Sequence, residues 1–154
     1  MNRTYLDNNA TMPLRPEARE AMVSAMDAVG NPSSVHAEGR AAKALIERAR
    51  AQVATAFGAE GADIIFTSGA TEAAGLACGG RGFLGAAIEH DAVAAWIDDA
   101  LPVGPLGQVD VAEPASSVLQ LANSETGVIQ DLPDGLAVVD AMVQSSREKE
   151  PRHG

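Results

Sequence analysis

Apolar residues recur at helical spacing in the first third of the chain. From about His36 to Phe57 they follow steps of three and four residues, which places them on one face of a helix. Gly58 is a typical residue to end such a run. We therefore expect a long amphipathic helix that buries one stripe, made of Ala42, Leu45, Ile46, Ala49, Val53 and Phe57.

A shorter helix precedes it. Proline suits a first helical turn, and Gly30-Asn31-Pro32 interrupts the run, so a helix is expected from about Pro16 to Val29. The connector Asn31-Pro32-Ser33-Ser34 offers serine hydroxyls as candidate caps for the second helix.

Short apolar runs alternate with helical segments in the rest of the chain. The segment 63–68 is typical of a buried strand and leads into an alanine-rich helix from about Thr71 to Cys78. A further helix is expected from about Asp91 to Ala100. Three more strands are expected at Phe83 to Ile88, Ser117 to Ala122 and Leu136 to Asp140. This alternation predicts an α/β fold with a mostly parallel sheet flanked by helices.

Charge and composition exclude several classes of partner and site. The net charge is −10, and Arg81 is the only basic residue between positions 51 and 146. That acidic middle argues against nucleic-acid or anionic-membrane partners. No apolar run approaches the roughly 20 residues of a membrane span, and the N-terminus lacks the apolar core of a signal peptide. We expect a cytoplasmic protein. A single cysteine, Cys78, excludes a disulfide framework and a cysteine-based metal cluster, and no metal site is expected.

The last ten residues differ from the rest. Residues 145–154 hold five charged side chains, a proline and a glycine, and no apolar side chain. They are expected to form a loose, disordered tail after one domain at 1–144.

The strongest candidate site is the junction Thr67-Ser68-Gly69-Ala70-Thr71-Glu72. It places amides and hydroxyls at a helix N-terminus, where unpaired N–H groups favour a phosphate. Gly69 would allow a tight turn and close approach to a ligand. Spacing alone leaves an ordinary capped helix start as an equal alternative.

Six motifs in order resemble the cysteine desulfurases, which are class V aminotransferase-like, fold-type-I pyridoxal phosphate proteins. The likeness covers roughly residues 4 to 144. The motifs are Tyr5-Leu6-Asp7-Asn8-Asn9-Ala10-Thr11, Gly30-Asn31-Pro32-Ser33-Ser34-Val35-His36, Phe66-Thr67-Ser68-Gly69-Ala70-Thr71-Glu72-Ala73, Ile88-Glu89-His90, Asn123-Ser124-Glu125-Thr126-Gly127-Val128-Ile129-Gln130 and Val139-Asp140-Ala141.

The resemblance implies roles for matching positions. Thr71, with the Gly69-Ala70 backbone, would hold the phosphate of pyridoxal phosphate. His90 would stack on the pyridine ring and move protons, and Asp140 would keep the ring nitrogen protonated. Without the family context, His90 is an ordinary histidine at a strand end and Asp140 a solvated strand cap.

Three departures from the family pattern stand out. Ser124 occupies the place of an asparagine that contacts the ring hydroxyl, and serine has a shorter reach. Gln144 follows Asp140 by four residues, whereas the family glutamine follows by three. The stretches 74–83 and 91–118 look shortened.

The family's reaction removes sulfur from L-cysteine, giving L-alanine and an enzyme persulfide. It needs a Schiff-base lysine and a nucleophilic cysteine. Neither Lys43 nor Lys149 lies in the family's Ser-Gly-His-Lys setting, and Cys78 follows the phosphate loop, where cysteine is usually inert packing.

We therefore expect a truncated fold-type-I large domain that is inactive alone and associates readily. The alternatives are an interaction module, which forms a homodimer or pairs with a full-length desulfurase, and one half of a split enzyme.

Overall fold

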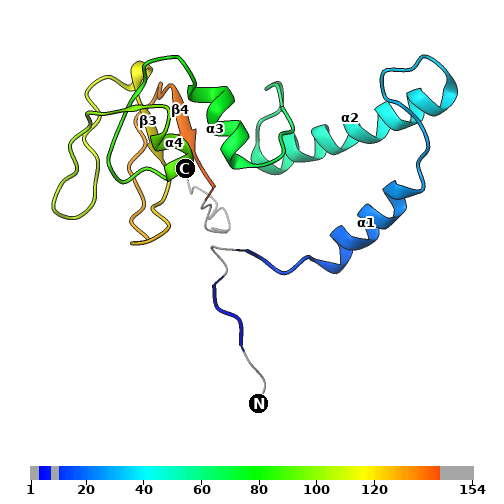
Figure 1. Ribbon diagram of the computed structural model, residues 1–154, viewed down its shortest axis with the longest axis horizontal. Coiled ribbons are helices and arrows are strands. Elements are labelled where there is room, and N and C mark those ends of the chain that lie inside the picture. Colours follow the sequence, from blue (N-terminus) through cyan, green and yellow to red (C-terminus); the bar gives the residue numbers. More distant parts are fainter. Residues whose placement is uncertain (1–3, 8–10, 143–154) are drawn as a thin grey trace, which may run out of the picture. The chain divides into compact units, whose positions relative to one another are not determined.

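The chain divides into two compact units, Met1–Phe66 and Thr67–Gly154. The computed structural model describes residues 4–7 and 11–142 (Figure 1). The segment 145–154, predicted to be a loose tail, lies outside the described residues, and so does Gln144.

The first unit contains both predicted helices. Helix α1 (Pro16–Met26) carries Pro16 in its first turn and ends short of the predicted Val29. Helix α2 (Ala37–Phe57) has 21 residues and ends at Gly58, whose φ of 63° is left-handed. The helix stop that the sequence places at Gly58 is confirmed.

The connection between α1 and α2 is packed so closely that two positions accept only glycine. Gly30 has a φ of 156°, and a Cβ on it would lie 2.3 Å from the carbonyl oxygen of Glu38. A Cβ on Gly39 would lie 2.4 Å from the carbonyl oxygen of Ser34. These two close approaches set the path of the chain into α2.

The predicted serine caps are wrong, because histidine caps α2. The amide of Gly39 donates to Nδ1 of His36 at 3.3 Å. The connector is held instead by Asn31, whose side-chain oxygen accepts from the amide of Ser33 at 2.9 Å. An Asn side chain that bonds two residues ahead is a common turn device, and it leaves His36 as the residue next to the helix.

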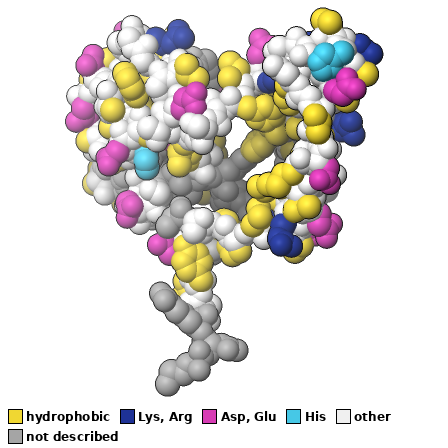
Figure 2. All heavy atoms as spheres, turned by 45° about the vertical axis from the view of Figure 1, so that its right-hand side comes forward, with side chains coloured by type: hydrophobic (Ala, Val, Ile, Leu, Met, Phe, Trp, Pro, Cys, Tyr) yellow, Lys and Arg dark blue, Asp and Glu magenta, His cyan; other side chains and the backbone are white. Residues whose placement is uncertain are grey.

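The predicted stripe on α2 is only partly buried. Leu45 is 39% exposed and Phe57 is 63% exposed, and Gly39 is the only fully buried residue of the helix. The other four stripe residues are half-buried: Ala42, Ile46, Ala49 and Val53. Helix α1 buries no residue, and hydrophobic side chains lie open on the surface (Figure 2).

The segment 63–68 forms no strand, contrary to the prediction. Ile65 is 74% exposed and Phe66 is 50% exposed. The guanidinium of Arg50 donates to the carbonyl of Ile64 and lies 5.1 Å from the centroid of the Phe66 ring. A strand needs a neighbouring strand for its ladder, and no described strand pairs with this segment.

The second unit alternates helices and short strands. Its elements are α3 (Ala70–Cys78), β1 (Leu84–Gly85), α4 (Asp91–Ala94), β2 (Asp98–Asp99), a 3₁₀ turn (Pro114–Ser116), β3 (Val118–Gln120) and β4 (Val138–Asp140). The helix predicted from Asp91 to Ala100 is wrong in its second half. There the amide of Asp98 donates to the carbonyl of Phe83, and pairing with β1 prevails over helical spacing.

The paired strands of this unit are parallel, which confirms the predicted α/β fold with a mostly parallel sheet. Strand β1 pairs with β2, and β3 pairs with β4. A single parallel bridge, Leu84 to Ser117, joins the two pairs. The carboxyl ends of β1, β3 and β4 therefore lie at one edge of the sheet, which is where open parallel sheets bind ligands.

The core of the second unit lies between α3, α4 and the sheet. Cys78, Val93 and Val118 are buried there, and Ala74, Ala77, Phe83, Ile97 and Val138 pack against them. Cys78 is fully buried, as expected of a packing residue, and burial raises the pKa of its thiol. No described helix is long and apolar enough to cross a membrane.

Candidate functional site at the carboxyl edge of the sheet

The start of α3 presents backbone amides. The first amide that bonds inside this turn is that of Ala73, which donates to the carbonyl of Gly69 at 3.1 Å. The amides of Ala70 and Thr71 precede it, and such amides point out of a helix N-terminus. The side chain of Thr71 is exposed beside them. This arrangement can hold an anion.

Neighbouring hydroxyls and one carboxylate are already engaged at this turn. The hydroxyl of Ser68 donates to Oε2 of Glu72 at 2.6 Å, and the amide of Ser68 donates to the same oxygen at 2.7 Å. These bonds hold the pKa of Glu72 below its usual range, the hydroxyl bond most of all. A phosphate here would depend on the amides and the hydroxyl of Thr71 rather than on Ser68.

Gly69 does not make the tight turn that the sequence suggests. Its φ of 170° is extended backbone that any residue adopts. A Cβ built on it would meet nothing within 4 Å. The glycine therefore leaves open space beside the α3 amides, which a bound group can enter.

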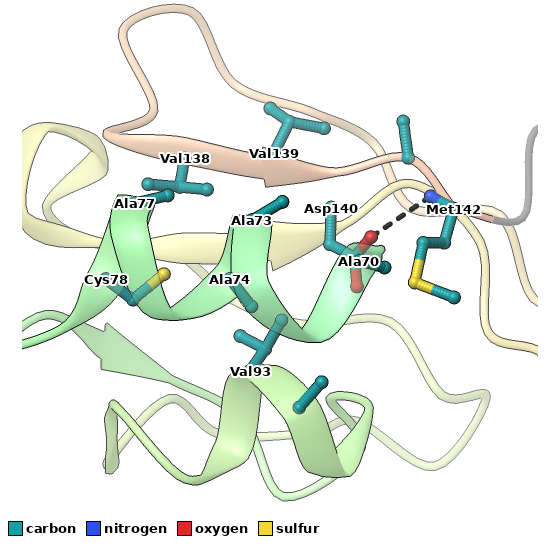
Figure 3. Close-up of a pocket in the computed structure, with 12 residues that line it drawn as sticks. Ala70, Ala73, Ala74, Ala77, Cys78, Val93, Val138, Val139, Asp140 and Met142 are labelled. Atoms are coloured by element: carbon teal, nitrogen blue, oxygen red, sulfur yellow. Dashed lines mark hydrogen bonds between the residues drawn. The ribbon is translucent and has the colours of Figure 1, made fainter. Parts of the chain in front are cut away.

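Asp140 ends strand β4. It pairs with Gln120 of β3, and its Oδ1 accepts from the amide of Met142 at 3.0 Å. Asp140 and Ala70 line one mostly apolar cavity with other residues of α3, α4 and β4, including Ala73, Val93 and Val139 (Figure 3). The start of α3 and the end of β4 thus come together.

His90 caps the short helix α4 at the carboxyl end of the β1 segment. Its Nδ1 accepts from the amide of Ala92 at 3.1 Å, and its ring is exposed. When Nδ1 accepts, a neutral imidazole carries its proton on Nε2. His90 therefore offers a ring face and an N–H to the surroundings.

Ser124 lies in a turn fixed by Asn123. The side-chain oxygen of Asn123 accepts from the amides of Glu125 and Thr126 and from the hydroxyl of Thr126, at 2.8 to 3.0 Å. Ser124 and His90 line a second cavity, which Glu89, Gln120 and Asn123 also line.

The predicted site residues therefore fall into two adjoining groups. Ala70 shares a cavity with Asp140, and His90 shares one with Ser124. Gln120 joins the groups, since it pairs with Asp140 and lines the cavity of His90. Gly69 and Thr71 line neither cavity and stay at the exposed start of α3.

Sequence reasoning assigned no role to Glu89, which is 6% exposed. Its Oε1 accepts from the amide of Gln120 at 2.9 Å, and its Oε2 is buried with no hydrogen-bond partner in the described part of the chain. Burial above all, and the negative charge of Asp140, raise the pKa of Glu89 to about 7. The sequence signals are its position directly after the apolar strand segment 83–88 and its place in the motif Ile88-Glu89-His90.

The candidate nucleophiles are one cysteine and two lysines. Lys43 is exposed on α2 in the first unit, and Lys149 lies outside the described residues. Cys78, the last residue of α3, lines the same cavity as Ala70 and Asp140, but its side chain is fully buried. Among the described residues no group of three or more His, Cys, Asp or Glu side chains is placed to hold a metal ion.

Comparison with known proteins places the chain in a family. The model of the aminotransferase class-V family matches residues 4–94. A cysteine desulfurase of Frankia sp. (strain EuIK1) is 38% identical over 82% of this chain. The selenocysteine lyase of Homo sapiens is 32% identical over 86% of it.

Two solved structures of NifS-like proteins resemble the fold of this chain. A NifS-like protein from Rickettsia africae ESF-5 superposes on 82% of this chain with a TM-score of 0.68 and 35% identity, and that part is 41% of the solved chain. A second NifS-like protein superposes on 94% of this chain with a TM-score of 0.72 and 28% identity, and that part is 50% of the solved chain.

The chain spans about two fifths of the length of these curated relatives, 39% of the Frankia protein and 40% of the human one. The alignment with the human protein runs over 178 positions but uses 86% of this 154-residue chain. The relative therefore has residues inside the aligned region that this chain lacks. The chain belongs to the aminotransferase class-V family, and its curated relatives include cysteine desulfurases.

Proposed function

We propose that this chain supplies part of the pyridoxal phosphate site of a cysteine desulfurase-like protein, for which the family reaction takes sulfur from L-cysteine. The observation that carries the proposal is the meeting of the α3 N-terminus with the end of β4, where Ala70 and Asp140 line one cavity. Phosphate-binding amides and a carboxylate at adjoining points suit the two ends of this cofactor.

The phosphate end fits the start of α3. The amides of Ala70 and Thr71 and the Thr71 hydroxyl supply hydrogen-bond donors, and Gly69 leaves room beside them. The exposed carboxylate of Glu72 opposes an anion, so we expect weak rather than tight phosphate binding.

The ring end fits three side chains at the carboxyl edge of the sheet. Asp140 would face the pyridine nitrogen and hold a proton there. His90 would cover the ring with its exposed imidazole, and Ser124 would offer its hydroxyl to the ring oxygen. When bound, pyridoxal phosphate supplies an electron sink for carbanions.

Neither the lysine nor the cysteine that the structure describes suits the family's covalent steps. Lys43 is a solvated helix residue, and Cys78 is a buried thiol with a raised pKa, which keeps it protonated and unreactive. We infer that these 154 residues bind the cofactor without a covalent link and do not desulfurate cysteine by themselves.

Equilibrium dialysis against pyridoxal phosphate tests the binding. We expect saturable binding that Thr71→Ala weakens roughly 10- to 100-fold, because a hydrogen bond to a charged group is worth about 1.5–3 kcal/mol. Asp140→Asn should weaken it as well. Thr55→Ala, an exposed threonine of α2, is the matched control. Equal binding by all four proteins would refute the assignment of Thr71 and Asp140.

A second candidate function is pairing, as a homodimer or with a full-length desulfurase. The exposed apolar side chains of the first unit favour it, among them Met22, Val23 and Met26 of α1. Mixing the chain with a full-length desulfurase and measuring mass by sedimentation tests this idea. Desulfurase activity that appears only when the chain meets a polypeptide carrying the missing lysine and cysteine would identify a split enzyme.

A further inference from the structure

Glu89 connects two parts of the candidate site. Its Oε1 accepts from the amide of Gln120 at the end of β3. The preceding carbonyl, that of Ile88, accepts from the side-chain amides of Gln120 at 2.8 Å and Asn123 at 3.1 Å. Three hydrogen bonds thus fasten the segment just before His90 to β3 and the turn that holds Ser124.

Among the described residues, no Lys or Arg forms an ion pair that would compensate a charge on Glu89. Asp140 of β4 acts on it as a like charge, and Cys78 of α3 lies within electrostatic reach. Asp91 and Glu125 line the same cavity, as does the imidazole of His90. The charge of Arg81 acts on Cys78.

A buried carboxylate with an unpartnered oxygen is costly, because burial removes water and nothing replaces it. A neutral carboxylic acid in the same place keeps Oε1 as an acceptor and removes the charge. The upward shift of the Glu89 pKa to about 7 agrees with this reasoning.

We propose that Glu89 is a positioning residue that works as a neutral acid, fixing the His90 segment against β3 while leaving Asp140 as the carboxylate charge of the site. This inference rests on the proposed function for the identity of the ligand. When Glu89 loses its proton, the bond from the Gln120 amide strengthens, but a second buried negative charge appears that repels Asp140. This charge also opposes the anionic cofactor, and the affinity for pyridoxal phosphate falls.

The backbone amide proton of Gln120 reports directly on Glu89, because it donates to the carboxyl group. We expect its NMR shift in the full chain to titrate with a midpoint near pH 7. In Glu89→Gln, which keeps an acceptor and cannot ionise, the shift should stay flat. Glu125→Gln removes an exposed carboxylate of the same cavity and should leave the midpoint within a few tenths of a pH unit.

The positioning role of Glu89 is tested by the NMR spectrum of the His90 ring and by the affinity for the cofactor. The ¹⁵N shifts of the His90 ring should match in the wild-type protein and Glu89→Gln but become averaged in Glu89→Ala. From about pH 6 to about pH 8, the affinity for pyridoxal phosphate should fall several-fold more in the wild-type protein than in Glu89→Gln.

A Gln120 shift that titrates near the ordinary pKa of a glutamate would overturn the neutral state, and identical His90 spectra in all variants would overturn the positioning role. Absence of cofactor binding to the wild-type chain at any pH would sink the proposed function. The Gln120 and His90 spectra would still decide the role of Glu89.

Discussion

Glu89 shows how one buried side chain ties stability to pH. Its pKa is about 7 in the folded chain against an ordinary value of 4.5. Between these values the folded chain binds more protons than the unfolded chain, so stability falls as pH rises. The contribution of Glu89 to stability is fully present below pH 4.5, the ordinary pKa, and it is lost once the pH has risen above about 7, the pKa in the folded chain.

We predict that the free energy of unfolding drops on the order of 3 kcal/mol between about pH 4.5 and about pH 8 through this residue. Urea unfolding at both pH values measures the drop. Glu89→Gln should flatten the profile by that amount, since the remaining titrating groups are common to both proteins. A variant profile as steep as the wild-type profile would contradict the assignment.

Gly30 occupies a backbone position that leaves no room for a side chain. Its φ of 156° and the 2.3 Å approach of a built Cβ to Glu38 predict that Gly30→Ala destabilises the chain by about 1–3 kcal/mol. Gly69→Ala is the matched control, because Gly69 is extended and open, and it should change stability little. Chemical unfolding of both variants checks the contrast.

At the scale of elements, the turn at 123–127 depends on one side chain. Asn123 accepts three hydrogen bonds and donates a fourth to the carbonyl of Ile88. Asn123→Ala should cost about 2–4 kcal/mol, since four part-buried hydrogen bonds are lost together. Gln108→Ala removes one exposed bond to the carbonyl of Ile129 and should cost under about 1 kcal/mol. Equal losses of stability would show that Asn123 is not the centre of the turn.

The sequence predicts elements best where local signals agree. Helices α1 and α2 follow from Pro16, the apolar spacing and Gly58, all of which act within a few residues. The segment 63–68 reads as a strand, yet it has no partner, because pairing depends on residues far away in the chain. Strand β2 was missed for the same reason, since its pairing with β1 overrides a helical pattern.

In the candidate site, too, local sequence signals can be predicted and long-range contacts cannot. The motifs around Thr71, His90 and Asp140 can be recognised in the sequence alone. The burial of Glu89 and its bond to Gln120 cannot, because they arise only when β3 lies beside the segment before His90. The sequence predicts that serines cap α2, whereas His36 does so in the structure. Several residue types can cap a helix, and which of them does depends on the backbone geometry.

At the scale of the whole molecule, exposed apolar surface is the main feature. Described large hydrophobic residues with more than half of their surface exposed include Leu14, Met26, Val29, Phe57, Ile65 and Leu106. Contiguous apolar surface drives association.

We therefore predict that sedimentation velocity finds concentration-dependent association. Met26→Glu should weaken it, whereas Glu17→Gln, at an exposed polar position of the same helix, should not. A monodisperse monomer with a sharp, reversible melt would contradict this expectation.

We propose that this chain holds pyridoxal phosphate through amides, a hydroxyl and a carboxylate but not through a lysine. Saturation with the cofactor, borohydride reduction and mass spectrometry of the intact chain and its peptides test this binding mode most directly. We predict saturable binding and no stoichiometric mass increase on Lys43 or Lys149. A full equivalent of reduced cofactor on either lysine would contradict it.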